Sequence, residues 1–220
     1  MKQSKFSARY MAAVAMFAAV SYVAVLISKA IPNVLGFLSY EPKDAFVVIA
    51  GMLYGPLTSV LISVIVSFIE MITISATGPY GFLMNIVSTC AFAVPAALLY
   101  QRYRSMKGAI GGLALGVVVM AAVMVLWNYI ITPFYMGVER SVVAGMLATV
   151  FLPFNLVKGL TNAGITLLLY KPIVTALRAA NLAQPSKGTA KAGFHLGYTL
   201  FAVAVLITGV LLLLVLMGKI

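Results

Sequence analysis

The sequence predicts an all-α integral membrane protein: a six-helix bundle with a short second span and one additional transmembrane helix at the C-terminus. Of its 220 residues, 63% are hydrophobic and only 9% are charged, and the mean hydropathy is +1.10. Soluble domains are far less apolar. The apolar segments are also too long for the strands of a membrane barrel, which alternate every second residue over about ten residues. Helices are therefore the expected way to cross the bilayer.

Seven apolar segments follow one another along the chain. We expect them at about 8–31, 45–54, 57–75, 80–100, 108–135, 142–177 and 193–217. The second is only half a span long because Gly55 and Pro56 stop it. A polar stretch rich in Pro, Gly and Ser precedes the last segment, and this composition is typical of a linker. The expected organisation is a membrane domain over 1–180, a polar cytoplasmic linker over 181–192 and the additional helix over 193–220. No internal repeat is visible, which argues against the inverted-repeat transporters.

Lysine and arginine residues set the expected orientation, because they accumulate on the cytoplasmic side. With a cytoplasmic N-terminus, ten of them lie inside and four outside: inside are Lys2, Lys5, Arg9, Arg102, Arg104, Lys107, Lys171, Arg178, Lys187 and Lys191, and outside are Lys29, Lys43, Arg140 and Lys219. The formal net charge of +11 is then a topology signal and an attraction to anionic lipid. It gives no indication of nucleic-acid binding.

Lys158 lies inside the sixth apolar segment, three residues after Asn155 and shortly after Pro153. A lysine at the centre of a span costs about 2.5–3.5 kcal/mol on insertion scales. Asn155 and Lys158 share one helix face, and Pro153 interrupts the hydrogen-bond ladder before them. Lys158 could snorkel to the headgroups, but we favour a pair of ligand-facing donors in a cavity on the outer side.

Other polar residues are expected at the same depth. The orientation above places Glu41, Asp44 and Glu139 in outer loops, and Glu70, Asn85, Asn128 and Asn155 in the outer halves of spans. Each asparagine taken alone could make a helix-to-helix hydrogen bond. For the whole set, a polar cavity open to the outside is the better explanation.

Aromatic residues gather near the same boundary: Phe37, Tyr40, Tyr80, Phe82, Trp127, Tyr129, Phe134 and Tyr135. An interfacial belt accounts for several of them. Trp127 next to Asn128, and Phe154 next to Asn155, place an aromatic ring beside an amide twice. This pairing suits a flat heteroaromatic ligand, which offers ring faces for stacking and in-plane atoms for hydrogen bonds.

Small residues form a stripe on the cytoplasmic half of the first span. Ala8, Ala12, Ala15 and Ala19 recur at spacings of four, three and four, which leaves a flat face for the close approach of another helix. That helix could belong to a partner protein or to the same chain. Gly51 with Gly55, and Gly112 with Gly116, are expected to serve internal packing.

Catalytic and metal chemistry find little support. The chain has one cysteine, Cys90, and one histidine, His195, so no metal site and no catalytic residues are expected. No Gly-rich phosphate loop ending in Lys-Ser or Lys-Thr occurs. The protein itself is therefore not expected to be an enzyme.

Several motifs together resemble the substrate-binding S component of energy-coupling factor (ECF) vitamin transporters, and most of all its riboflavin-specific member. They are 37–44 (FLSYEPKD), Gly51 with 54–56 (YGP), 77–78 (TG) followed by 81–85, 127–128 (WN) with 132–135 (TPFY), and 153–158 (PFNLVK). The resemblance covers about residues 8–175. It implies that residues 1–180 form a substrate-binding domain, and the final span departs from the six-helix pattern.

The resemblance implies capture of riboflavin, or a related flavin such as FMN, from outside, for ATP-driven uptake. Asn128, Asn155 and Lys158 would contact the flavin ring, and the loop 37–44 would cap the pocket. The expected substrate-binding residues are Phe37, Tyr40, Asp44, Asn85, Asn128, Tyr135, Asn155 and Lys158. Ala8, Ala12, Ala15 and Ala19 would dock on a membrane-embedded coupling subunit, itself carried by two ATPase subunits. The implied location is a prokaryotic cell membrane, spanned several times, and no cofactor is expected. The alternatives are an S component for another vitamin or small heterocycle, and a stand-alone facilitator or channel.

Overall fold

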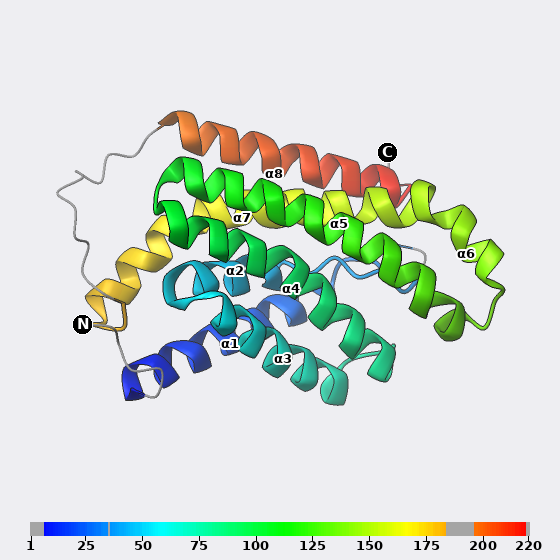
Figure 1. The fold of residues 1–220 in the computed structure, drawn as a ribbon, viewed down its shortest axis with the longest axis horizontal. Helices are drawn as coiled ribbons and strands as arrows, with labels where there is room; N and C mark the ends of the chain where they lie inside the picture. Colours follow the sequence, from blue (N-terminus) through cyan, green and yellow to red (C-terminus); the bar gives the residue numbers. More distant parts are fainter. Residues whose placement is uncertain (1–6, 35, 184–195, 219–220) are drawn as a thin grey trace.

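The computed structural model describes residues 7–34, 36–183 and 196–218, and it is helical through most of this range (Figure 1). The elements are α1 (Ala8–Ser28), α2 (Lys43–Tyr54), α3 (Pro56–Thr73), α4 (Gly78–Tyr103), α5 (Met106–Met136), α6 (Arg140–Met146), the π-helix η1 (Leu147–Phe151), α7 (Leu152–Ala179) and α8 (Leu196–Leu216). The all-helical prediction is therefore confirmed.

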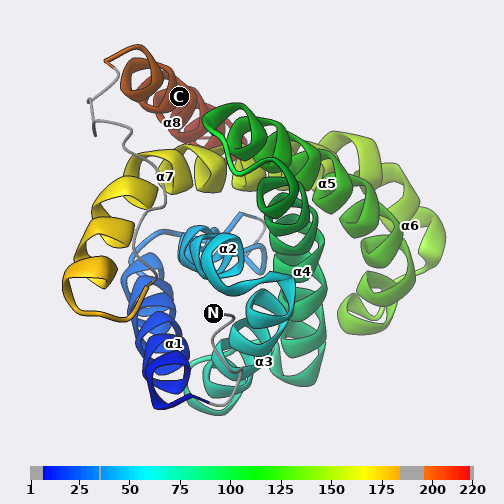
Figure 2. The same cartoon turned by 60° about the vertical axis from the view of Figure 1, so that its left-hand side comes forward.

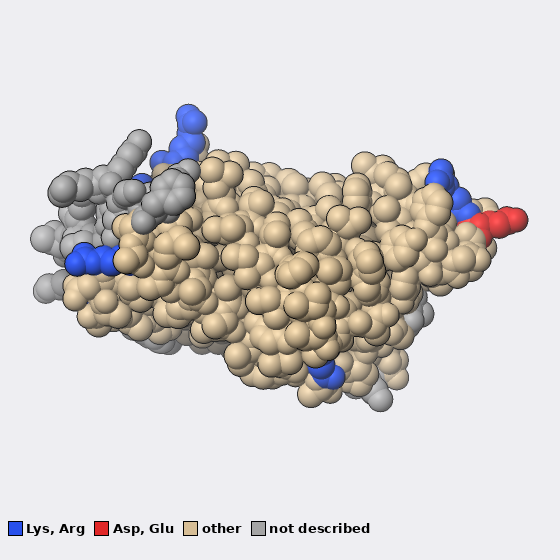
Figure 3. All heavy atoms as spheres, turned by 90° about the horizontal axis from the view of Figure 1, so that it is seen from below, with Lys and Arg blue, Asp and Glu red and all other residues tan. Residues whose placement is uncertain are grey.

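Six helical segments of the described chain are long and apolar enough to cross a membrane. Five of them are α1, α3, α4, α5 and α8, and the sixth is the continuous run Arg140–Ala179 formed by α6, η1 and α7. With its 12 residues, α2 is too short to be one of them, as the sequence predicts. On the face in Figure 3, charged side chains lie near the two ends and at the lower margin, with an uncharged surface between. This distribution fits a protein surrounded by lipid.

The helix bounds differ from expectation by a few residues. α1 ends at Ser28 instead of continuing to Ile31, and its final turn is closed by the Ser28 hydroxyl, which donates to the carbonyl of Val25 at 2.7 Å. α4 continues to Tyr103. Most of the expected linker, and the first residues of the expected last span, fall within 184–195, outside the described residues.

The short helix α2 occupies the centre of the bundle, with α1, α3, α4 and α7 around it (Figure 2). Val47, Val48, Ile49 and Ala50 are completely buried, and Phe46, Leu53 and Tyr54 are half-buried. Most of the α2 surface therefore packs against neighbouring helices, which explains its apolar sequence from Ala45 to Leu53. Gly55 ends it with a φ of +116°, a conformation that favours glycine. Pro56 then opens α3 at once.

The start of α2 is capped from another helix. Pro42, at its N-cap, supplies no side-chain hydrogen bond. Instead the Asn162 side-chain oxygen, on α7, accepts from the Ala45 amide at 3.2 Å, and the Asn162 amide donates to the carbonyl of Glu41 at 3.1 Å. Asn162 thereby ties the entrance of α2 to α7.

Glycines allow close helix contacts, as expected for Gly112 and Gly116. A methyl group at Gly112 would lie 2.7 Å from the carbonyl oxygen of Ala96, and one at Gly116 would lie 2.5 Å from that of Phe92. The backbones of α5 and α4 are therefore in close contact at these two glycines. Gly51 is similarly enclosed by Ser59 on α3, whereas Gly55 serves the turn described above.

α8 packs along α7, on the side of the bundle away from α1 (Figures 1 and 2). A methyl group at Gly164 on α7 would lie 3.2 Å from the carbonyl oxygen of Ala202, and one at Gly209 on α8 would lie 2.2 Å from the hydroxyl of Thr161. Small residues on both helices thus let the two backbones approach closely.

Candidate functional site

A cavity opens at one end of the bundle, where α1, α3 and α5 end and where α4 and α7 begin. Its walls come from Lys29 and residues of the loop before α2, from the last turn of α3 and the loop after it, and from the facing ends of α4, α5 and α7. Segments far apart in the sequence therefore meet at one depth.

Six of the eight expected substrate-binding residues line this cavity: Phe37, Asn85, Asn128, Tyr135, Asn155 and Lys158. Tyr40 and Asp44 do not. Tyr40 is buried in an apolar cluster beside the cavity. Asp44 is completely buried, accepts a hydrogen bond from the hydroxyl of Thr89 at 2.6 Å, and lies behind Lys158.

Four asparagines line the cavity, and the three that lie on helices, Asn85, Asn128 and Asn155, use their amides differently. Asn128 and Asn155 donate to the carbonyls of Met124 and Phe151, one turn earlier in their own helices. Asn85 bridges two elements instead, donating to Glu70 at 2.9 Å and to Glu41 at 3.4 Å. A helix-to-helix role therefore fits Asn85 alone, and the side chains of Asn128 and Asn155 remain on the cavity wall.

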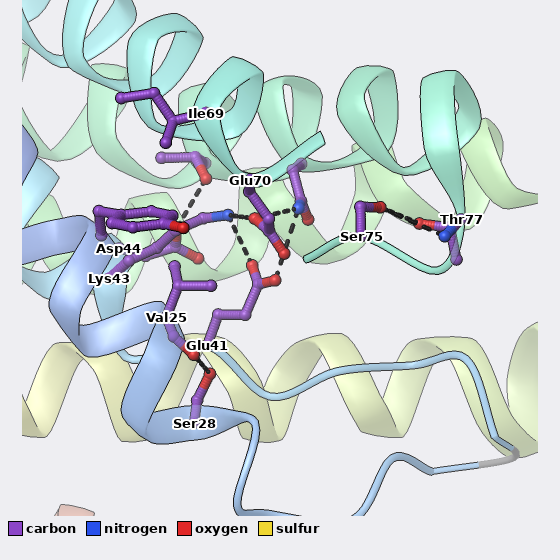
Figure 4. A network of polar contacts seen from close by, with 12 residues as sticks. Val25, Ser28, Glu41, Lys43, Asp44, Ile69, Glu70, Ser75 and Thr77 are labelled. Carbon is purple, nitrogen blue, oxygen red and sulfur yellow. Dashed lines mark hydrogen bonds and ion pairs between the residues drawn. The ribbon is translucent and has the colours of Figure 1, made fainter. Parts of the chain in front are cut away.

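A network of ion pairs, buried except for Lys29, lies at the inner wall of the cavity. The Lys43 ammonium lies 2.8 Å from Glu41 and 2.9 Å from Glu70, and Lys29 reaches the other oxygen of Glu70 at 3.0 Å. Figure 4 shows Glu41, Lys43 and Glu70 pointing toward one another. Buried charges need such partners, because an unpaired one costs several kcal/mol.

Lys158 lies between two carboxylates without a short contact to either. Its ammonium nitrogen is 3.7 Å from Glu41 and 3.6 Å from Asp44, both longer than an ordinary hydrogen bond. Only 5% of its side chain is exposed, so snorkelling to the headgroups does not describe it. The two carboxylates hold the ammonium group in place electrostatically, and its N–H groups are available to donate hydrogen bonds to a ligand.

Cations and anions balance around the cavity. The cations are Lys29, Lys43 and Lys158, and the anions are Glu41, Asp44 and Glu70. Glu41 lies in the loop before α2, outside the candidate spans. Burial would raise the pKa of its carboxyl, but the nearby Lys43 and Lys158 ammonium groups lower that pKa to about 2. Glu41 is therefore ionised at neutral pH.

Aromatic rings stand on one side of the cavity. The rings of Phe37 and Tyr135 are 5.6 Å apart, and those of Tyr80 and Tyr135 are 6.1 Å apart. Phe154 also lines the cavity, next to Asn155. Trp127 does not take the corresponding place beside Asn128, because its side chain packs against the main hydrophobic core. Ring faces and amides thus occur together, from partly different residues than the sequence suggested.

Comparison with known proteins agrees with this architecture. A sequence model of the family described as "ECF transporter, substrate-specific component" matches residues 9–174. The chain belongs to this family. As an S component, it is a substrate-binding part of a transporter, and the fold and family expected from its motifs are confirmed.

Two curated relatives and one solved structure are similar to this S component. It is 27% identical over 186 residues to the riboflavin transporter FmnP of Bacillus subtilis (strain 168), covering 77% of this chain and 95% of the relative. It is 25% identical over 171 residues to the riboflavin transporter RibU of Staphylococcus aureus (strain TCH60), covering 75% and 90%. A structure titled "Structure and mechanism of the S component of a bacterial ECF transporter" matches with a TM-score of 0.65 and 24% identity, over 76% of this chain and 96% of the other.

Sequence reasoning missed several residues of the S-component cavity. Glu41 and Lys43 are expected only within the capping loop 37–44 and Lys29 only as an outer-side charge, yet Glu41 and Lys29 line the cavity and Lys43 joins their network. For Glu70 the sequence indicates the depth but no partner. A carboxylate inside an apolar span requires a buried cation, and that requirement could have indicated Lys29 and Lys43.

The alanine stripe of the S component lies on the surface of the chain. Ala8, Ala12, Ala15 and Ala19 are all exposed, while Ala13 and Ala18 on the other face of α1 are buried. Internal packing, the alternative explanation of the stripe, therefore does not hold in the described part of the chain. The stripe lies at the opposite end of α1 from the cavity.

Proposed function

We propose that this S component captures riboflavin from the outer side of the membrane and delivers it to partner subunits for ATP-driven uptake. Family membership supports the transport role, and the names of the two curated relatives support the choice of vitamin. The observation that carries the proposal is the cavity itself, where amide and ammonium donors face aromatic rings.

The donors suit the edge of a flavin. Its ring system is flat and presents carbonyl oxygens and ring nitrogens in the ring plane. Asn128, Asn155 and Lys158 supply donors from two neighbouring helices, and Asn85 adds an amide from α4. Lys158 offers the most donors to a ligand, because both of its carboxylate neighbours lie beyond hydrogen-bond distance. Phe37, Tyr135 and Phe154 supply apolar contact to ring atoms.

The balance of charge favours riboflavin over its phosphate ester FMN. Riboflavin is uncharged, and the three cations around the cavity are matched by three anions. A phosphate group would need cations without partners, since a buried anion is costly unless it is paired. Lys43 and Lys29 are already engaged by Glu41 and Glu70.

Transport requires other subunits in this proposal. A membrane-embedded coupling subunit would pack on the exposed alanine stripe, and two ATPase subunits bound to it would hydrolyse ATP. No ATP-binding motif occurs in the chain itself. The orientation, with the N-terminus in the cytoplasm and the cavity facing outward, belongs to the same proposal and rests on the distribution of lysine and arginine.

Titration of the purified protein tests the ligand. Riboflavin fluorescence should be quenched on binding with a tight, saturable 1:1 curve, and preparations from flavin-containing medium should absorb in the flavin region. FMN should bind at least about tenfold more weakly, a difference of about 1.4 kcal/mol. Thiamine, a cationic heterocyclic vitamin, is the negative control.

Binding of thiamine but not riboflavin would leave the family intact and overturn the vitamin. A stand-alone facilitator is distinguished by reconstitution. Vesicles that contain only this chain should bind riboflavin without equilibrating it across the bilayer, whereas a facilitator would equilibrate it.

A further inference from the structure

The additional helix α8 lies beyond the part of the chain that the family model matches, which ends at residue 174. One face of α8 is directed at the bundle. Ala202, Leu206, Gly209 and Leu213 recur at spacings of four, three and four, and Ala202 and Leu213 are 1% and 6% exposed. The contacts of Ala202, Leu206 and Gly209 with Gly164 and Thr161 fix α8 on α7. Leu213 extends the same face by one further turn.

Leu213 reaches a hydrophobic cluster that is separate from the main core. Its buried members come from five parts of the chain: Val34, Leu38 and Tyr40 before α2, Val143 on α6, Phe151 on η1, Phe154 and Val157 on α7, and Leu213 on α8. Leu216 and Met217 pack against its edge, as does Phe37. The C-terminal end of α8 therefore shares a cluster with the residues that cover the cavity.

The covering residues, 36–40, are here called the cap segment. Phe37, Leu38 and Ser39 of this segment line the cavity. Its hydrogen bonds are local: Val34 and Leu38 exchange backbone hydrogen bonds of 3.0 Å, and Asn33 bonds to Gly36 and Ser39. Among the described contacts, the position of the cap segment relative to the helices therefore depends on the apolar packing of Val34, Phe37, Leu38 and Tyr40.

We propose that α8 is a positioning element for the cavity: by placing Leu213 in this cluster, it holds the cap segment against α7 and so slows opening of the cavity. Glycine and alanine contacts anchor the helix, and the leucine at its end completes the packing around the cap segment. The effect on riboflavin rests on the proposed function, but the effect on the cap segment does not.

Hydrogen exchange of the ligand-free protein tests the proposal without any ligand. The amides of Val34 and Leu38 are suitable reporters because each donates to the other residue's carbonyl, and they exchange when the segment opens. In Leu213→Ala, exchange of a peptide covering 33–41 should be faster by on the order of tenfold, because truncation of a buried leucine removes packing from the cluster. Leu213→Met, which restores the volume, should return exchange to the parent rate.

Two controls separate positioning from general stability. Leu177→Ala makes the same truncation in the main core, at the other end of α7, and should leave exchange of 33–41 unchanged while lowering thermal stability. Leu211→Ala changes an exposed leucine of α8 and should alter neither the exchange of 33–41 nor the thermal stability. If Leu213→Ala does not fold, Leu216→Ala at the edge of the cluster takes its place, with a smaller acceleration expected.

Equal acceleration in Leu177→Ala and Leu213→Ala, or none in Leu213→Ala, would overturn the proposal. Riboflavin dissociation provides the functional measurement and should be faster in Leu213→Ala by a similar factor, with Leu177→Ala near the parent rate. A parent protein that does not bind riboflavin would contradict the proposed function alone, since the exchange experiment still decides the role of α8.

Discussion

Asn155 and Asn162 lie two turns apart on α7, and their surroundings assign them different tasks. Asn155 lines the cavity, and among the described residues its amide donates to the carbonyl of Phe151, at the end of η1. Asn162 is completely buried and joins the Ala45 amide to the Glu41 and Lys158 carbonyls. The first is available to a ligand, whereas the second is committed to the fold.

Substitution of each by alanine should separate these tasks. Asn155→Ala should weaken riboflavin binding at least about tenfold with little change in thermal stability, because a ligand acceptor loses its donor. Asn162→Ala should lower the free energy of unfolding by about 1–3 kcal/mol, because the α2 entrance is left with unsatisfied groups. Fluorescence titration and thermal unfolding in detergent measure the two effects.

The contrast between the two variants is the decisive result. Parent affinity in Asn155→Ala would remove Asn155 from the binding site. A loss of affinity in both variants, in proportion to a loss of stability, would mean that Asn155 also serves the fold.

The location of several cavity residues could be predicted because the sequence leaves them few alternatives. Asn128, Asn155 and Lys158 interrupt apolar spans, and a polar group there must face a cavity or a partner. Glu41 and Lys43 do not interrupt an expected apolar span, since Glu41 lies in the loop before α2 and Lys43 is the first residue of α2. Their burial follows from the insertion of α2 into the centre of the bundle, which local sequence does not encode.

At the scale of elements, α1 presents opposite faces to the bundle and to its surroundings. Ala13, Val14, Phe17 and Ala18 pack inward, and the alanine stripe faces outward. Lipid gives no hydrophobic drive for helix association, so close van der Waals contact on a flat face supplies much of the binding energy. Binding of a partner helix to the stripe should therefore depend strongly on the size of the side chains in the stripe.

Ala12→Trp should abolish riboflavin uptake in cells and co-purification with the coupling and ATPase subunits, because the indole ring holds a partner helix away from the stripe. Riboflavin affinity of the isolated chain should not change, since Ala12 is exposed and remote from the cavity. Uptake assays, pull-downs and titration provide the three measurements.

Ala114→Trp serves as the matched control, because Ala114 is also an exposed alanine, on α5. It should retain uptake. Normal uptake in Ala12→Trp, or equal loss in both variants, would show that the stripe is not the docking face.

The π-helix η1 is an element that the sequence did not reveal. The pattern indicated one continuous span with a proline, and Pro153 does lie just after the irregularity. A π-turn closes its hydrogen bond over five residues instead of four and has no composition of its own. The sequence therefore predicts the apolar span over 142–177 but not the π-turn within it.

For the whole molecule, orientation is the property on which the proposed direction of transport depends. The loops before α5 and before α6 lie at opposite ends of α5. Met106, the first residue of α5, and Ser141, the second residue of α6, are exposed next to these loops and can carry a reporter.

Single cysteines at these positions, in a Cys90→Ala background, should react on opposite sides of the membrane. A membrane-impermeant maleimide should label Ser141→Cys in intact cells and Met106→Cys only after permeabilisation, as the excess of cytoplasmic lysine and arginine requires. The reverse pattern would turn the cavity toward the cytoplasm and contradict capture from outside.

Three polar contacts fasten α1 to α3 along its length: Tyr10 to Thr58 at 3.0 Å, Tyr22 to Thr73 at 2.7 Å, and Lys29, just past the helix end, to Glu70 at 3.0 Å. A 21-residue helix is a stiff rod about 30 Å long. α1 therefore connects the alanine stripe, near its first residue, to the Lys29–Glu70 ion pair at the cavity. We expect a partner that tilts α1 by binding the stripe to change the Lys29–Glu70 distance.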